Sequence, residues 1–394
     1  MNNINSIDHT LYKESLFTNR IIKHSTLKDK VNKLRSHGLF KVDVAGYSAQ
    51  QREIYSVTLG HGSTSVLLWS QMHGDEPTGT LAFFDLFNFF AANDEHKALR
   101  EHLLNTCTLH FIPMVNPDGA ELYQRRNAQG IDINRDFLQQ QSPEAQLLAR
   151  LQQEVQPEFG FNMHDQESLW SVAGTKQPAS ISLLAPPCDA AATVTPERLK
   201  AIQVISSISE MLNELIPGQV GRWSEDFEPR AFGDNFQRLG TATILVEAGG
   251  HHNDPERQLV RKLNFDVVLH ALNHIATGQY RNQSATPYYN IPTNSKELFH
   301  IIIKNCKVAT YGGTITVDVG LNYTEKLDPE SKTLIKTYAV TDMGDLSVWN
   351  AYHRHDANGA VLSGALILDE KANLNIIIDD QTHLVFVNGL LIQQ

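Results

Sequence analysis

Apolar runs alternate with polar turns over the first two thirds of the chain. Short apolar runs predict strands at residues 53–59, 64–71, 107–115, 159–163 and 241–246. Longer runs with apolar positions three and four apart predict helices that begin near residues 80, 142, 195 and 254. Strands that alternate with helices in this way predict an α/β domain over residues 1–280, with a mixed central sheet flanked by helices.

The pattern changes after residue 278. Residues 279–295 are polar, contain two prolines and show no period, so we predict a linker. Beyond it, β-rich runs separated by glycine-bearing turns lie at residues 298–303, 314–319, 334–340, 361–368, 374–378 and 383–387. These runs predict a small antiparallel β sandwich or barrel over residues 290–394.

Composition narrows the possible functions. The formal charge of -11 argues against nucleic-acid partners and against binding to anionic membranes. The N-terminus lacks a basic start followed by an apolar core, and no apolar run approaches the thickness of a bilayer. The three cysteines, Cys107, Cys188 and Cys306, are widely separated and fit reduced, buried thiols. We therefore expect a cytoplasmic protein, and the sequence leaves its oligomeric state open.

A histidine and a carboxylate stand three positions apart just after the strand at residues 64–71. An imidazole nitrogen of His73 and a carboxylate oxygen of Glu76 both suit zinc, and Gly74 between them lets the chain turn sharply. Taken alone, this pair is better interpreted as two surface loop residues, because short motifs match by chance.

Two later strands end in residues that suit the same chemistry. His164 follows residues 159–163 directly, and as a third protein ligand it would leave a fourth position for water. Glu247 ends the apolar run at residues 241–246. A carboxylate beside metal-activated water can take its proton and pass it to a leaving amine, which contributes roughly 10² to 10⁴ in rate.

A polar stretch between these strands carries Arg125, Arg126, Asn134 and Arg135. A guanidinium group grips a carboxylate at two points, and a second one stabilises an oxyanion. As an isolated cluster, these side chains fit a solvated surface.

The order of the motifs resembles that of the zinc metallocarboxypeptidases of the carboxypeptidase A type. The resemblance begins near residue 47, ends near residue 275, and rests on five segments in order: His73-x-x-Glu76, Asn116-Pro117-Asp118-Gly119, Arg125 with Gly130 to Arg135, His164, and Glu247-Ala248-Gly249-Gly250. The short span from Arg135 to His164 is similar to that of bacterial members that act on small peptides.

This resemblance implies a role for each polar residue. His73, Glu76 and His164 would bind one zinc ion, and Glu247 would be the catalytic carboxylate. Arg125 would polarise the scissile carbonyl, with Arg126 as the alternative if the register shifts by one. Asn134 and Arg135 would hold the terminal carboxylate of a peptide substrate.

Part of the chain departs from the family. Residues 221–247 lack the tyrosine that often binds substrate, so either Trp223, Phe227 or Arg230 replaces it or the role is absent. The position that lines the specificity pocket falls at residues 232–234, with Gly233 as the nearest match.

Several acidic residues have possible supporting roles. Asp136 is expected either to hold Arg135 or to lie at the surface, and Asp165 either to orient His164 or to cap a turn. Asp75 would assist the neighbouring ligands. Arg230 and Asp234 are close enough to line the specificity pocket, but a solvated ion pair is the preferred interpretation of both.

Two other functions fit part of the sequence. Amidohydrolases of the aspartoacylase or succinylglutamate desuccinylase type resemble carboxypeptidases in their zinc ligands, carry a β domain after the catalytic one, and act on N-acyl amino acids. The Asn116 to Gly119 segment and the spacing from Arg125 to Asn134 are closer to peptidases. A binding protein that kept the fold without catalysis is the second alternative, and the presence of every expected polar group disfavours it.

Overall fold

A computed structural model describes residues 7–379 and 382–393 of the chain. The chain divides into two compact units. The larger unit takes in the chain as far as Ser168, together with Val172–Thr175 and Ala179–Asn294. The smaller unit takes in Leu169–Ser171, Lys176–Pro178 and the chain from Ser295 onward.

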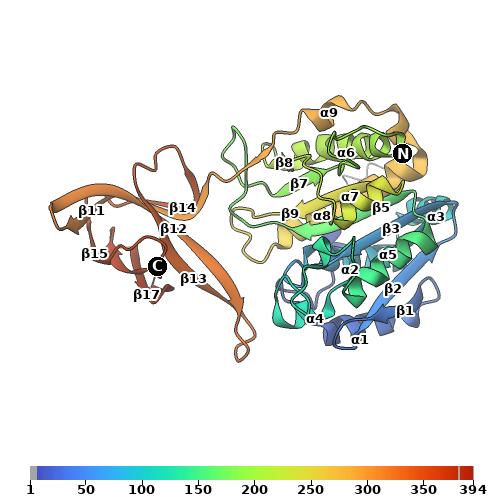
Figure 1. Cartoon of the computed structure of the whole chain (residues 1–394), viewed down its shortest axis with the longest axis horizontal. Helices are drawn as coiled ribbons and strands as arrows, with labels where there is room; N and C mark the ends of the chain where they lie inside the picture. Colours follow the sequence, from blue (N-terminus) through green and yellow to red (C-terminus); the bar gives the residue numbers. More distant parts are fainter. Residues whose placement is uncertain (1–6, 380–381, 394) are drawn as a thin grey trace. The chain divides into compact units, whose positions relative to one another are not determined.

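A mixed sheet, eight-stranded in the described part of the chain, forms the centre of the larger unit (Figure 1). Its order is β1-β2-β4-β3-β5-β9-β7-β8. Strands β4, β3, β5 and β9 run parallel, whereas β2 pairs antiparallel with β1 and β4, and β7 pairs antiparallel with β9. The strands are β1 (Lys41–Tyr47), β2 (Glu53–Gly60), β3 (Thr64–Ser70), β4 (Cys107–Ile112), β5 (Phe159–Asp165), β7 (Ile181–Leu184), β8 (Val220–Arg222) and β9 (Ala242–Ala248).

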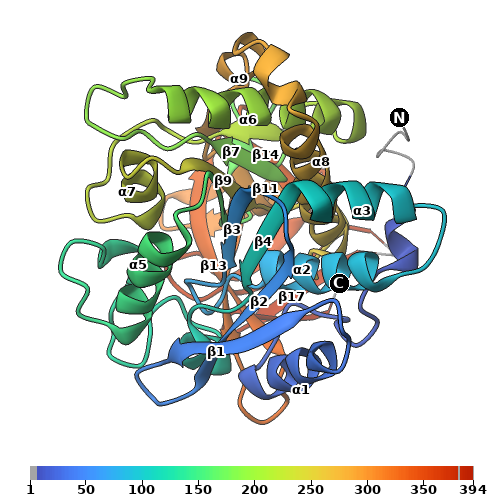
Figure 2. The ribbon, with the colours of Figure 1, turned by 90° about the vertical axis from the view of Figure 1, so that its right-hand side faces the viewer.

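Helices cover both faces of this sheet (Figure 2). One face packs against α2 (Thr78–Ala91), α3 (Lys97–Thr106), α6 (Pro196–Leu215) and α8 (Gln258–Thr277), and the other against α5 (Pro143–Val155) and α7 (Phe232–Arg238). The remaining elements of the larger unit and its border are η2 (His9–Leu11), α1 (His24–Arg35), α4 (Pro117–Leu122), η3 (Ile133–Arg135), η4 (Gln279–Asn282), α9 (Thr286–Tyr289), β6 (Ser171–Val172) and β10 (Asn294–Ser295). The predicted mixed sheet with flanking helices is confirmed.

Strand β3 explains why the sheet is covered on both sides. Val66 and Leu68 join the core beneath α2 and α8, whereas Leu67 and Trp69 join the core beneath α5 and α7. Successive side chains of a strand point to opposite faces, so an unbroken apolar run needs a helix layer on each face.

The start of α8 differs from the prediction. This helix begins at Gln258 rather than near residue 254 because the preceding residues form a turn, in which Arg257 has a left-handed φ of 50°. The carboxylate of Asp254 accepts hydrogen bonds from the backbone N–H groups of Gln258, Leu259 and Val260. Asp254 therefore satisfies the free donors of the first helical turn from outside the helix.

The predicted linker at residues 279–295 is wrong over most of its length. It contains η4 and α9, and the side chains of Tyr280 and Tyr288 are buried in the core of the larger unit. The hydroxyl group of Tyr288 donates to Glu225 at 2.9 Å. Two isolated aromatic residues anchor this segment, and neither creates a helical or strand period.

The smaller unit is a curled β sheet, in the region where the β-rich runs predicted a small sandwich or barrel. Its strands are β11 (Leu298–Thr310), β12 (Gly313–Leu327), β13 (Leu334–Gly344), β14 (Asn350–Asp356), β15 (Val361–Ala365), β16 (Asn373–Ile377), β17 (His383–Val387) and β18 (Leu390–Gln393). Most neighbours are antiparallel, but β14 and β15 both pair with β11 in parallel, so the purely antiparallel prediction is wrong. Every helix in the described residues is too short or too polar to span a bilayer.

Candidate metal centre

The polar residues singled out in the sequence gather at one edge of the central sheet. Strands β3, β5 and β9 are neighbours and run parallel, so their carboxyl ends meet at the same edge. His73 follows β3, while His164 and Glu247 lie near the ends of β5 and β9. The fold thus brings three distant segments of chain to one place.

Two imidazole rings share one carboxylate at this edge. The Nδ1 atom of His73 lies 2.7 Å from Oε1 of Glu76, and the Nδ1 atom of His164 lies 2.7 Å from Oε2 of the same residue. One ligand atom from each of the three side chains lies within 4.8 Å of the other two, and all three residues are buried. This geometry brings together three groups that suit a divalent metal.

The turn between His73 and Glu76 depends on a glycine. A Cβ atom on Gly74 would lie 2.0 Å from the backbone carbonyl carbon of Gly119, which is closer than atoms approach in proteins. The absence of a side chain therefore lets the turn lie against α4.

The pKa values of Glu76, His164 and His73 are shifted by burial and by the charges of their neighbours. Burial raises the pKa of Glu76, but the nearby charges of His73 and His164 outweigh burial and hold that pKa below its usual range. Burial lowers the pKa of His164. Burial also acts to lower the pKa of His73, but Glu76 and Asp132 outweigh it and raise this pKa to about 9. The surroundings therefore shift the pKa values of the two imidazoles in opposite directions, upward for His73 and downward for His164.

Asp132 supports this centre, and it received no role from the sequence. Its Oδ1 atom lies 3.1 Å from Nε2 of His73, while its Oδ2 atom accepts from Nε of Arg125 at 2.9 Å. Its carboxylate also accepts the backbone N–H of Asn134 and so caps η3. The sequence could have pointed to Asp132 only through its position, two residues before Asn134 in the segment from Gly130 to Arg135.

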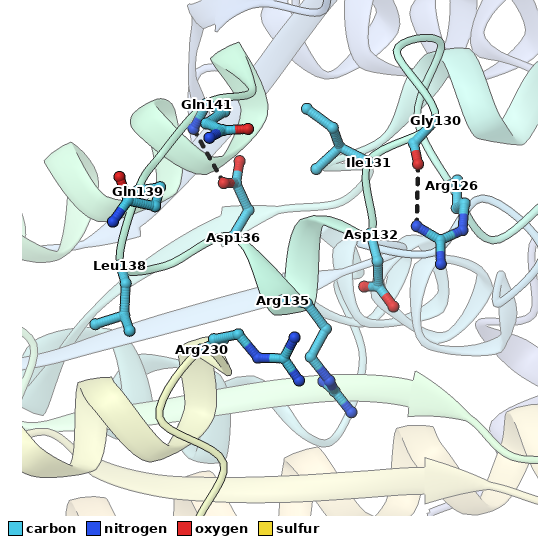
Figure 3. A pocket seen from close by; sticks show the side chains of 10 residues that line it. All are labelled: Arg126, Gly130, Ile131, Asp132, Arg135, Asp136, Leu138, Gln139, Gln141 and Arg230. Atoms are coloured by element: carbon cyan, nitrogen blue, oxygen red, sulfur yellow. Dashed lines mark hydrogen bonds between the residues drawn. The ribbon is translucent and has the colours of Figure 1, made fainter.

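The structure brings Arg125, rather than Arg126, to the metal centre. A guanidinium nitrogen of Arg125 lies 3.3 Å from Oε1 of Glu76, and the side chain is 43% exposed. Arg126 instead donates to the carbonyl oxygen of Gly130 at 3.0 Å and lines a neighbouring pocket (Figure 3). Arg125, which the sequence analysis preferred over Arg126, is thus the arginine that contacts a residue of the metal centre.

Asn134 and Arg135 lie beside the cluster and have different partners. The side-chain oxygen of Asn134 accepts the N–H of Phe232 at 3.0 Å, and its Nδ2 atom lies 3.4 Å from Nε2 of His164. Arg135 forms an ion pair with Glu228 at 3.3 Å.

Asp136 does not hold Arg135, contrary to one of its two expected roles. Its carboxylate accepts hydrogen bonds from Gln141 and Ser142 and so organises the loop that leads into α5. The surface alternative is also wrong, because Asp136 is buried.

Glu247 sits beside His164 in the sheet. The two residues are direct partners in the ladder between β5 and β9. Within the described residues, the carboxylate of Glu247 makes no hydrogen bond. Burial and then the charge of Glu76 raise the pKa of Glu247 well above its usual value. Glu247 is therefore a carboxyl group poised to hold a proton in the metal-free protein.

Comparison with known proteins agrees with this geometry. Residues 29–175 match the zinc carboxypeptidase family Peptidase M14. The matched segment is similar to a zinc carboxypeptidase domain. The matched segment includes both histidines and the glutamate of the metal centre, whereas Glu247 lies beyond it.

Individual curated relatives match only a small part of the chain. Carboxypeptidase SOL1 of Arabidopsis thaliana is 38% identical over 72 residues, which cover 18% of this chain and 15% of that protein. The match thus spans well under two thirds of this curated relative.

Solved structures resemble the domain in fold. A metallo-carboxypeptidase from Burkholderia cenocepacia has a TM-score of 0.54 at 15% identity, covering 66% of this chain and 70% of that one. The Pseudomonas aeruginosa metallo-carboxypeptidase in complex with (2-guanidinoethylmercapto)succinic acid has a TM-score of 0.53 at 17% identity, with coverage of 66% and 70%.

Two further acidic residues, Asp165 and Asp75, are next to metal-centre residues in the sequence. The side chain of Asp165 accepts from Thr78 at 2.6 Å and pairs with Arg257 at 3.2 Å, so it does not orient His164 through a side-chain contact. Its backbone N–H donates to Oε2 of Glu76 at 3.2 Å. Burial raises the pKa of Asp75 to about 6.

The expected pair of Arg230 and Asp234 is wrong. Each contacts Glu228 instead: Arg230 through its guanidinium group, and Asp234 by accepting the backbone N–H of Glu228. Asp234 is buried rather than solvated.

Proposed function

We propose that the protein is a zinc-dependent metallocarboxypeptidase that hydrolyses the amide bond next to a free C-terminal carboxylate. One observation carries the proposal: His73, Glu76 and His164 meet within 4.8 Å at the edge of the sheet where Glu247 lies near the end of the adjacent strand β9. The family match supports the same reaction class.

The donor set fits one zinc ion. Two imidazole nitrogens and one carboxylate are typical protein ligands of catalytic zinc, and three such ligands leave room for water or substrate. His73, Glu76 and His164 would hold the ion, and Asp132 would fix the ring of His73 from its other nitrogen. Bound there, zinc would polarise the scissile carbonyl and lower the pKa of water.

The surrounding side chains would handle the proton and the substrate. Glu247 would take a proton from the attacking water and pass it to the leaving nitrogen as the amide bond breaks. Arg125 would stabilise negative charge on the carbonyl oxygen, since it already lies beside Glu76.

The remaining two groups would bind the end of the substrate. The guanidinium of Arg135 and the amide of Asn134 would bind the terminal carboxylate of a peptide, because a guanidinium group grips a carboxylate at two points. The substrate would therefore be a peptide with a free C-terminus.

Hydrolysis of N-acyl amino acids by an aspartoacylase-type enzyme is not favoured, because the matching family is that of zinc carboxypeptidases. We also propose a cytoplasmic location. All three cysteines are buried free thiols, which suits a reducing compartment.

The first experiment tests the roles of Glu247 and the metal ligands. Glu247→Gln should retain one zinc per chain and lose nearly all hydrolysis of a panel of short peptides, because the amide cannot take the proton. His73→Ala should lose both metal and activity, whereas Glu214→Gln, which changes an exposed glutamate on α6, should behave as the wild type. Full activity in Glu247→Gln would remove this residue from the mechanism.

The second experiment tests the substrate class. Peptides with free C-termini should be hydrolysed, their C-terminal amides should not, and Arg135→Ala should mainly impair use of the free acids. Faster hydrolysis of N-acyl amino acids than of any peptide would overturn the assignment as a carboxypeptidase.

A further inference from the structure

The carboxylate of Glu228 contacts two arginines, Arg230 and Arg135. Its Oε2 atom accepts from Nη2 of Arg230 at 2.8 Å and pairs with Nε of Arg135 at 3.3 Å. Its Oε1 atom accepts from Nε of Arg230 at 2.9 Å. The guanidinium groups of Arg135 and Arg230 lie close together on one side of the pocket (Figure 3).

The two contacts differ in strength. Arg230 binds Glu228 through two nitrogens and two oxygens, with distances of 2.8 and 2.9 Å, whereas Arg135 makes one longer contact of 3.3 Å. Two-point pairing of this kind is the stronger geometry for a guanidinium and a carboxylate. Arg230 is therefore the main partner of Glu228, and Arg135 is held weakly.

Backbone contacts fix the position of Glu228. Its N–H donates to Oδ1 of Asp234 at 3.0 Å, and its Oε1 atom accepts the N–H of Arg230 at 3.1 Å. The side chain of Glu228 is 28% exposed and that of Arg135 is 38% exposed, so water and a ligand can reach both. The pairing with Arg230 also lowers the pKa of Glu228, to about 2, so the carboxylate is charged at neutral pH.

We propose that Glu228 is an internal competitor of the substrate's carboxylate for Arg135, and that Arg230 limits this competition by holding Glu228 to itself. The inference rests on the proposed function, in which Arg135 binds the terminal carboxylate. A substrate carboxylate then replaces the single contact of Glu228 on Arg135 without breaking the stronger pair of Glu228 and Arg230. Glu228 and Arg230 thereby set the affinity for the free C-terminus.

The proposal predicts opposite effects for the two members of the pair. Glu228→Gln removes the competing charge, so ligands with a free carboxylate should bind about three- to tenfold more tightly, the range expected for partly exposed ion pairs. Arg230→Ala frees Glu228 to pair fully with Arg135, so the same ligands should bind more weakly by a similar factor.

Calorimetric binding tests this without turnover if every protein is zinc-loaded, full-length and also carries Glu247→Gln, which is expected to keep zinc and lose hydrolysis. The probes are N-acetyl amino acids and the corresponding N-acetyl amino acid amides, which differ only in the terminal carboxylate. We expect both variants to change the dissociation constants of the acids and to leave those of the amides unchanged. Asp226→Asn is the matched control, because Asp226 is an exposed acid in the same loop that contacts Ser224 and neither arginine.

The outcomes separate this proposal from the proposed function. Equal effects of Glu228→Gln on acids and amides, or the same effect from Asp226→Asn, would overturn the competition, whether or not the enzyme hydrolyses peptides. Tighter acid binding in Glu228→Gln that disappears when Arg135→Ala is added would support it, even if the protein proved to hydrolyse no peptide. Thermal unfolding of each variant checks that the fold is intact.

Discussion

His164 and Glu247 are direct partners in the parallel ladder between β5 and β9. Partnered residues of neighbouring strands project toward the same face of a sheet, so the backbone itself sets the spacing between an imidazole and a carboxylate. No side-chain hydrogen bond holds Glu247 in the described part of the chain. Its carboxylate is therefore free to face a water or a substrate, while its main chain is fixed.

Asp132 is expected to control metal affinity. Asp132→Asn keeps an oxygen that can cap η3 but removes the charge that faces His73 and Arg125. We expect zinc affinity to fall by about 10- to 100-fold, as for other residues that orient metal ligands. Competition with a chelator measures this, with the exposed Asp43→Asn as control. Unchanged affinity would limit Asp132 to a role in the loop.

Arg125 and Arg126 form a matched pair of adjacent arginines. Arg125→Ala should lower kcat by about 10² to 10³, the effect of losing one group that stabilises an oxyanion. Arg126→Ala should change kcat by less than about twofold, because its side chain donates to Gly130 instead of the metal centre. Steady-state kinetics on one peptide separates them. The reverse order of effects would mean that the loop rearranges when substrate binds.

Gly74 is expected to be required for the metal centre. Gly74→Ala places a Cβ atom against the backbone of Gly119 and must displace the turn that carries His73 and Glu76. We expect loss of zinc and a destabilisation of about 1 to 3 kcal/mol. Gly38→Ala is the control, since no atom lies within 4 Å of its added Cβ. Normal zinc content in Gly74→Ala would show that the turn can shift without opening the site.

Asp234 should make stability depend on pH. Burial raises its pKa from 3.8 to about 6, so the folded protein binds this proton more tightly than the unfolded chain. Folded stability due to this group is present below about pH 4 and falls as the pH rises through about 6. Asp234→Asn keeps an acceptor for the N–H of Glu228 and removes the charge.

Urea unfolding at pH 4 and pH 7, with chelator present at both, measures this effect. The free energy of unfolding of Asp234→Asn minus that of the wild type should be larger at pH 7 by on the order of 2 kcal/mol. If the free energy of unfolding changes with pH equally in both proteins, Asp234 does not cause the change. Other buried acids would then cause it, such as Asp75 and Asp165, whose pKa values are also raised to about 6.

The strands and the polar residues at their ends were predictable from local sequence. An unbroken apolar run such as Val66 to Trp69 can only be a strand or a buried helix, and its length and flanking residues favour the strand. The residues after such runs fall at the edge of a parallel sheet, which is why His73 and His164 could be singled out before any coordinates.

Contacts between distant loops could not be read from sequence. Glu228 lies far along the chain from Arg135, and no periodicity links them. Tyr280 and Tyr288 are isolated aromatic residues in a polar stretch, so their burial depends on a surface formed by the rest of the fold. Strand β14 contains His353, Arg354 and His355, and it forms because β11 offers a free edge.

The turn before β3 contains a position that suits site-specific chemical labelling. Ser63 is exposed and precedes β3, whereas His73 follows its other end, so the two positions are separated by roughly 20 Å of extended strand. Cys107, Cys188 and Cys306 are buried. A thiol introduced as Ser63→Cys would therefore be the readily labelled one, and a fluorophore or surface tether attached there would leave the catalytic edge open to substrate.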